Sequence, residues 1–165
     1  MDPKRRIALL ALAASVLAGC LLGAGGFTFV TAEGTSYLSE DPRVCVNCHI
    51  MREQYDGWQH ASHHAAATCN DCHLPHDSLA GKYTVKALNG WHHGRAFTMQ
   101  DFAEPIRIKP GNAKVLEANC LRCHGDVAEA MLARGPLGVP TDPTQGANLH
   151  GCVRCHGEVG HGPRR

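Results

Sequence analysis

The chain has 165 residues, a formal net charge of +1 and an aromatic content of only 5%. A charge this close to zero provides no basic field for binding nucleic acid, so we exclude that class of partner. The 12 histidines and 9 cysteines are far above ordinary usage. A short chain of this composition is organised around prosthetic groups and not around a large apolar core.

The first predicted element is a membrane helix over residues 7–30. This segment contains no charged residue and follows Lys4, Arg5 and Arg6. A helix of this length is about 36 Å long, which is enough to cross a hydrocarbon layer of ~30 Å. By the positive-inside rule, residues 1–6 stay in the cytoplasm and residues 31–165 form a periplasmic domain. We therefore expect a single-pass protein of the bacterial inner membrane.

Two features of this segment have alternative interpretations. A cleaved signal peptide has an apolar region of only about 7–15 residues, and here the apolar run is longer. Residues 17–20 resemble a lipoprotein processing site, but ten further uncharged residues after Cys20 favour a small residue within a helix; whether Cys20 is lipidated stays open. Gly19 and Gly23 have the spacing of small-residue contacts, through which two anchor helices can dimerise.

Four copies of one motif, Cys-x-x-Cys-His, follow the anchor. They are Cys45-Cys48-His49, Cys69-Cys72-His73, Cys120-Cys123-His124 and Cys152-Cys155-His156. This pattern attaches haem c: the sulfurs bond to the porphyrin vinyl groups and the histidine binds the iron. Zinc ribbons and disulfides also use paired cysteines, but neither requires the adjacent histidine. The first cysteines lie 24, 51 and 32 residues apart, so we expect four haems packed within one domain.

Spacing alone does not decide the second axial ligand of each haem. The candidates are His60, His63, His64, His76, His92, His93, His150 and His161, together with Met51, Met99 and Met131. Met51 lies two residues after His49, so the two side chains cannot readily bind opposite faces of one iron. Met51 can bind another iron, pack against the protein, or replace His49. Replacement would leave an open face at which a small reductant could dock.

Beyond the anchor the pattern predicts a mainly α fold of short helices with much loop. Asn112 is the expected N-cap of a helix that runs through the third motif, and a second helix begins near Asp126 and stops at Gly135 and Pro136. Residues 135–147 contain three prolines and three glycines, which indicates an extended loop. We find no strand pattern.

Several long segments carry a family resemblance: CVNCHIM, QYDGWQHASH, TCNDCHLPH, GKYTVKALNGWHHGRAFT, NCLRCH and CVRCHGEVGHG. They resemble the NapC/NirT family of membrane-anchored multihaem quinol dehydrogenases, and within it most closely the small subunits of cytochrome c nitrite reductase. The resemblance runs from the anchor to the C-terminus. It implies one transmembrane helix followed by a small tetrahaem cytochrome c ectodomain.

The resemblance also implies an axial ligand set. Met51 would take the proximal position on haem 1 in place of His49, leaving the distal face to the quinol. His73 would bind haem 2, whose other ligand would be a lysine of the catalytic partner. Haem 3 would be bound by His124 and His161, and haem 4 by His156 and His63.

The implied quinol site lies on one predicted helix. Lys82 matches a lysine that the family places beside haem 1, and Asn89 occupies the position where family members commonly carry an acid. On a helix Lys82, Lys86, Asn89 and His93 would share one face. An amide cannot accept the quinol proton, so the acceptor stays open between Lys82, a neighbouring histidine and water. Alternatively, the lysines form a solvated helix face.

The function implied by the resemblance is oxidation of a membrane quinol, with menaquinol expected. Electrons would pass singly through the haems to the catalytic subunit of a periplasmic multihaem nitrite reductase. We do not expect this chain to reduce nitrite itself, because it has no second domain and no motif for a lysine-ligated catalytic haem. Two alternatives are service to another periplasmic reductase, for nitrate or an amine oxide, and a passive anchored relay without a quinol site.

Overall fold

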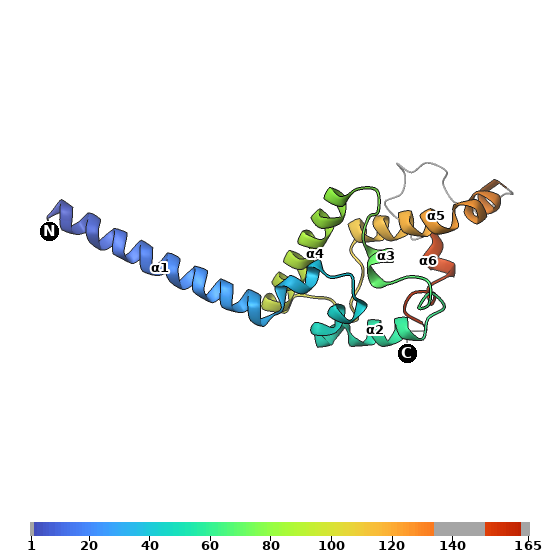
Figure 1. The fold of residues 1–165 in the computed structure, drawn as a ribbon, viewed down its shortest axis with the longest axis horizontal. Helices are drawn as coiled ribbons and strands as arrows, with labels where there is room; N and C mark the ends of the chain where they lie inside the picture. The colour runs from blue at the N-terminus through green and yellow to red at the C-terminus, as the bar shows by residue number, and fades with distance from the viewer. Residues whose placement is uncertain (1, 134–150, 163–165) are drawn as a thin grey trace. The chain divides into compact units, whose positions relative to one another are not determined.

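The computed structural model describes residues 2–133 and 151–162. Within these ranges every regular element is helical and no strand occurs, so the predicted mainly α fold is confirmed (Figure 1). The chain divides into two compact units, Met1–Ser36 and Tyr37–Arg165. The expected loop at 135–147, the stop signal at Gly135 and Pro136, His150 and the side chain of Met131 lie outside the described residues.

The first unit contains α1 (Pro3–Thr31). Asp2 caps this helix by accepting a hydrogen bond from the backbone N–H of Lys4 at 3.1 Å, and Pro3 supplies the fixed φ that suits a first turn. The helix therefore begins ahead of the predicted span and includes the basic residues. Its most apolar window has a mean hydropathy of 2.4 and none of its residues is buried, so by length and composition it can cross a membrane.

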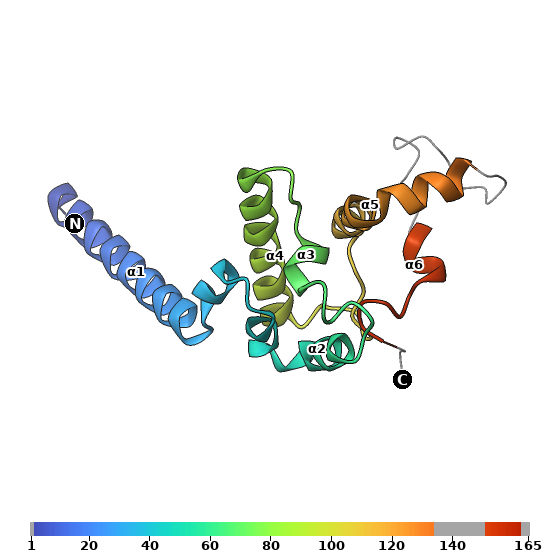
Figure 2. The same ribbon diagram turned by 45° about the vertical axis from the view of Figure 1, so that its right-hand side comes forward.

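The remaining elements are short, apart from two longer helices. They are η1 (Gly34–Leu38), η2 (Pro42–Asn47), η3 (His49–Met51), α2 (Arg52–Gln59), α3 (Cys69–His73), α4 (Leu79–Met99), α5 (Pro110–Ala133) and α6 (Gly151–Cys155). The second motif is α3 itself, and α3 lies between α4 and α5 in both views (Figures 1 and 2). The α3 helix packs against α5, and α6 packs against the same helix.

The contact between α3 and α5 is organised by Asn119. Its buried side-chain amide donates to the backbone carbonyls of Cys72 at 2.9 Å and Leu74 at 2.7 Å. These carbonyls lie at the end of α3, where a helix leaves acceptors without intrahelical partners. At the other end of α3, Thr68 and Asp71 form a reciprocal capping box. Both ends of the second motif are therefore fixed by named hydrogen bonds.

The α5 element agrees with the prediction in one respect and departs from it in another. The two successive helices that were expected are present, joined across a kink at His124, where φ is −118° and ψ is 22°. The prediction of Asn112 as the N-cap is wrong, because the helix already begins at Pro110. Asn112 lies inside the first turn, and its side chain donates to Asn89 on α4 at 2.9 Å.

The C-terminal segment returns to α2 at very short range. A Cβ atom added to Gly57 would lie 2.0 Å from the carbonyl oxygen of His161, so only glycine permits this approach. Gly162 has a φ of +66°, which favours glycine, and it packs on the backbone of Gly57. The backbone that carries His161 is thereby held against α2.

Candidate functional site

The first motif places His49 and Met51 in one short turn, η3. A 3₁₀ turn has three residues per turn, so side chains two positions apart point roughly 240° apart around its axis. In the structure His49 is exposed and Met51 is half-buried. The two side chains therefore cannot serve one iron together, and Met51 is the one directed into the protein.

The attachment cysteines of successive motifs lie next to one another. Cys45 of the first motif is hydrogen-bonded to Cys69 of the second, and Cys120 of the third to Cys152 of the fourth. Burial, followed by the nearby thiols of Cys120 and of Cys123, raises the pKa of Cys72. The four attachment sites thus form a connected series in sequence order.

Polar side chains tie the first two motifs together. Asn70, between the cysteines of the second motif, donates to the carbonyl of Ser39 at 3.2 Å and to the carboxylate of Glu40 at 3.0 Å. Glu40 lies just ahead of the first motif and also accepts from Lys86 at 2.9 Å and Lys82 at 3.0 Å. These contacts, the one with Lys86 foremost, lower the pKa of Glu40 to about 2.

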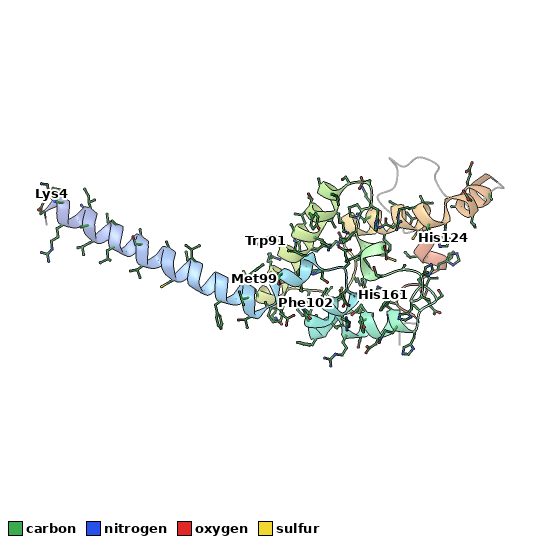
Figure 3. All side chains as sticks on the ribbon, viewed as in Figure 1. Lys4, Trp91, Met99, Phe102, His124 and His161 are labelled. Atoms are coloured by element: carbon green, nitrogen blue, oxygen red, sulfur yellow. The ribbon has the colours of Figure 1, made fainter. Side chains whose placement is uncertain are left out.

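The two expected distal histidines are held in the manner of haem ligands. His63 and His161 each use Nδ1 against a backbone carbonyl, that of Val159 at 3.1 Å and that of Gln54 at 2.8 Å. This contact fixes the ring and leaves Nε2 for a metal. Figure 3 labels His161 near α2 and His124 on α5.

Each of these rings lies opposite a motif histidine. The ring centres of His63 and His124 are 5.9 Å apart, and those of His73 and His161 are 6.0 Å apart. Two imidazoles that bind one metal from opposite sides through bonds of about 2 Å have ring centres roughly 6 Å apart. In the described residues His63 therefore lies near His124 and His161 near His73, whereas the resemblance implies that His63 shares an iron with His156 and His161 with His124. Burial lowers the pKa of His73 to about 4, so its imidazole is neutral, as metal ligation requires.

The candidate quinol residues lie on α4, and the predicted common face exists. Lys82 and Lys86 both reach Glu40, and the side chain of Lys86 is only 6% exposed against 22% for Lys82. Asn89 accepts a hydrogen bond from Asn112, and His93 bonds to the hydroxyl of Tyr37. The lysine end of this face therefore packs against the segment that leads into the first motif, Asn89 contacts α5, and His93 is exposed.

The described residues fit a set of bound haems. Leu74 and Ala113 are the only buried apolar side chains in the described ranges, so these parts of the chain form almost no core of their own. Each motif supplies two sulfurs and one imidazole in the order that haem c attachment needs. Haems held at motifs this close together would lie near one another, an arrangement that suits electron transfer.

A model of the NapC/NirT cytochrome c family, N-terminal region, matches residues 4–164. The chain belongs to this family. It is accordingly a c-type cytochrome that binds haem c, and the family together with α1 identifies it as anchored in the inner membrane. The resemblance found in the motifs is confirmed.

Two relatives are particularly similar to this family member. Cytochrome c-type protein NrfH of Wolinella succinogenes is 35% identical over 134 residues, which cover 81% of this chain and 76% of the relative. Cytochrome c nitrite reductase subunit NrfH of Nitratidesulfovibrio vulgaris is 37% identical over 110 residues, 66% of either chain. A solved structure of a cytochrome c nitrite reductase NrfHA complex bound to the HQNO inhibitor matches with a TM-score of 0.57 and 25% identity, covering 91% of this chain and 92% of that one.

The sequence did not single out two residues of this region, Glu40 and Tyr37. Glu40 is ion-paired with both lysines of the α4 face, and Tyr37 is hydrogen-bonded to His93. Both precede the first motif and are remote in sequence from α4. The only available signal was the position of His93 on the predicted face, one turn beyond Asn89.

Proposed function

We propose that this family member oxidises a membrane quinol, menaquinol by expectation, at haem 1 and passes the electrons through haems 2, 3 and 4 to the catalytic subunit of a periplasmic nitrite reductase. The observation that carries the proposal is the connected series of attachment cysteines, which begins beside the α4 face and continues through α3, α5 and α6. The partner is inferred from the names of the relatives and of the solved NrfHA complex.

The proposed topology follows the charge of the N-terminus. Residues 1–6 are cytoplasmic, residues 7–30 span the membrane, and residues 31–165 form the periplasmic tetrahaem domain. Lys4, Arg5 and Arg6 are the basic residues retained in the cytoplasm. Dimerisation through Gly19 and Gly23, and the state of Cys20, stay predictions.

The proposed ligands of haem 1 and haem 2 are Met51 and His73, with His49 displaced from the iron. The half-buried position of Met51 and the exposure of His49 support this choice. The second ligand of haem 2 is proposed to be a lysine of the partner in the assembled complex. His124 with His161, and His156 with His63, are the proposed pairs of haems 3 and 4; the ring distances favour a different pairing in the chain alone.

The proposed quinol site is the α4 face beside the first motif. Lys82 and Asn89 are its residues implied by the family. Lys82 is ion-paired with Glu40 at 3.0 Å, which holds its ammonium group beside the first motif. The side-chain carbonyl oxygen of Asn89 accepts a hydrogen bond from Asn112, and the side-chain N–H groups of Asn89 could donate to a ligand.

The first test is anaerobic mixing of the detergent-purified holoprotein, without a partner, with a reduced menaquinol analogue. The expected result is rapid growth of the reduced c-haem absorption band, and inhibition by HQNO. A preparation that holds four haems and responds to dithionite, yet is not reduced by the analogue, would contradict the quinol site.

A passive relay is the rival function, and spectroscopy separates the two. A relay has four six-coordinate low-spin haems, whereas a quinol dehydrogenase keeps at least one iron high-spin or open to ligand exchange. Service to another periplasmic reductase, for nitrate or an amine oxide, is supported less, because cytochrome c nitrite reductase is the enzyme named for the NrfH subunit of Nitratidesulfovibrio vulgaris and for the solved complex.

A further inference from the structure

Tyr37 and His93 form a hydrogen-bonded pair on the α4 face. The hydroxyl of Tyr37 lies 2.8 Å from Nδ1 of His93, and the ring centres are 6.1 Å apart. The tyrosine ring is seated on the helix at Gly90, where an added Cβ would be 3.6 Å from two ring carbons. Both partners are therefore held in place by α4.

The pair lies beside the first haem-attachment motif. Burial raises the pKa of Tyr37 to about 12, and Cys48 and Cys45 are near enough to add to this effect. The phenol therefore keeps its proton and donates, so Nδ1 of His93 is the acceptor and its own proton is on Nε2. His93 itself is exposed, so Nε2 can exchange with water.

The other polar groups of this face are unsuited to accepting a proton. Lys82 and Lys86 are ion-paired with Glu40, whose carboxylate is held by these lysines and by Asn70. An amide such as Asn89 has no basic site. Among the described polar groups of the α4 face, Tyr37 and His93 form the pair that is uncharged and has an exposed member, His93, from which a proton can pass to water.

Resting on the proposed quinol oxidation, we propose that Tyr37 and His93 accept the quinol proton at haem 1. The quinol hydroxyl donates to the oxygen of Tyr37 while the phenolic proton moves to Nδ1 of His93. Haem 1, when bound, would accept one electron from the quinol at the same time. The imidazolium then releases the proton on Nε2 to water. Before the second cycle, exchange with water would return the proton of His93 to Nε2 and the phenol to Nδ1, and the electron would have to pass on to the next haem; the second cycle then removes the second proton and electron to give the quinone.

The charged groups around His93 set the pH range of this step. Desolvation lowers the pKa of His93, and Lys109 and then His92 add to the effect. Tyr37 is the titratable group that faces it from the preceding segment. The neutral, proton-accepting imidazole is therefore fully present at neutral pH, and the rate is expected to fall only below the ordinary range of histidine, about 6.5.

The test compares His93→Gln and Tyr37→Phe with a matched control in the tetrahaem holoprotein. Reduction by the menaquinol analogue should slow roughly 100-fold or more, as for loss of a general base. The wild-type rate should rise with pH and level off near neutrality, and this rise should disappear in His93→Gln. Tyr83→Phe, which removes the hydroxyl of a neighbouring tyrosine of α4 outside the pair, should stay close to wild type. Dithionite should reduce every variant alike.

A second readout needs no turnover. Haem quenching of HQNO fluorescence in the oxidised protein should show affinity lower by roughly tenfold in Tyr37→Phe, as for loss of one hydrogen bond. If the quinol analogue reduces wild type, and both variants retain the wild-type rate, pH profile and HQNO affinity, then Tyr37 and His93 do not accept the quinol proton, although quinol oxidation itself is supported. If the analogue does not reduce wild type at all, quinol oxidation is contradicted, and the role of Tyr37 and His93 is contradicted with it.

Discussion

Met51 and His49 are neighbours in one turn with opposite surroundings. The thioether is half-buried and the imidazole is exposed. A methionine ligand raises the potential of its haem relative to histidine, which would make haem 1 a ready acceptor of quinol electrons. At the scale of single residues, the proposed ligation by Met51 would therefore govern the first step of electron flow.

We predict that Met51→Leu, which keeps the volume but removes the sulfur, changes the absorption and EPR spectra of one haem and lowers its potential. Potentiometric titration of the purified variant measures this change. Met99→Leu is the matched control, because Met99 ends α4 with 65% of its surface exposed. Unchanged spectra in Met51→Leu would mean that Met51 only packs against the protein and that His49 is the axial ligand of haem 1.

At the scale of elements, α3 and α5 hold each other through buried polar contacts more than through apolar ones. Asn119 immediately precedes the third motif and binds two carbonyls of the second motif's end. Such a contact specifies the register between two helices because the amide must meet both acceptors. The spacing of haems 2 and 3 therefore depends on one side chain.

We predict that Asn119→Ala lowers the free energy of unfolding by about 2 kcal/mol or more, because two buried carbonyls lose their donor. Urea denaturation followed by the Soret band of the holoprotein measures the loss. Asn112→Ala removes one part-buried side-chain hydrogen bond, and should cost about 1 kcal/mol. If the two substitutions lowered the free energy of unfolding equally, the contact of Asn119 with α3 would be no more stabilising than the single hydrogen bond of Asn112.

The features that could be predicted from the sequence are those that depend on residues close together in the chain. The four motifs, the anchor helix and the common face of Lys82, Lys86, Asn89 and His93 follow from residue type and helical period. Glu40 and Tyr37 were missed because they meet α4 across 46 and 56 positions of chain. The start of α5 was misplaced because Asn112 looked like a cap, whereas its side chain is used between helices.

At the scale of the whole molecule, the chain alone supplies a histidine opposite His73. His161 occupies this position because the C-terminal segment is held against α2 at Gly57. In the resemblance, this place belongs to a lysine of the partner. We therefore predict that His161 closes haem 2 in the isolated protein and that a lysine of the partner closes it in the complex.

We predict that His161→Ala contains one more high-spin haem than the isolated wild-type protein, because one iron loses its second imidazole. EPR spin quantitation of the oxidised proteins gives these numbers. Addition of the nitrite reductase partner should abolish this difference if His161 serves haem 2, because the partner's lysine then closes that iron. A difference from wild type that persists with the partner bound would mean that His161 serves haem 3.

The contact between Cys45 and Cys69 has a consequence for biogenesis. In an oxidising compartment, two free thiols at this range are liable to join as a disulfide. If the chain folded before haem attachment, it would bring together two thiols that attach different haems, and a disulfide between them would block both attachment sites. We expect haem to be ligated while the chain is still extended after export, so that folding begins only when every sulfur is already capped as a thioether.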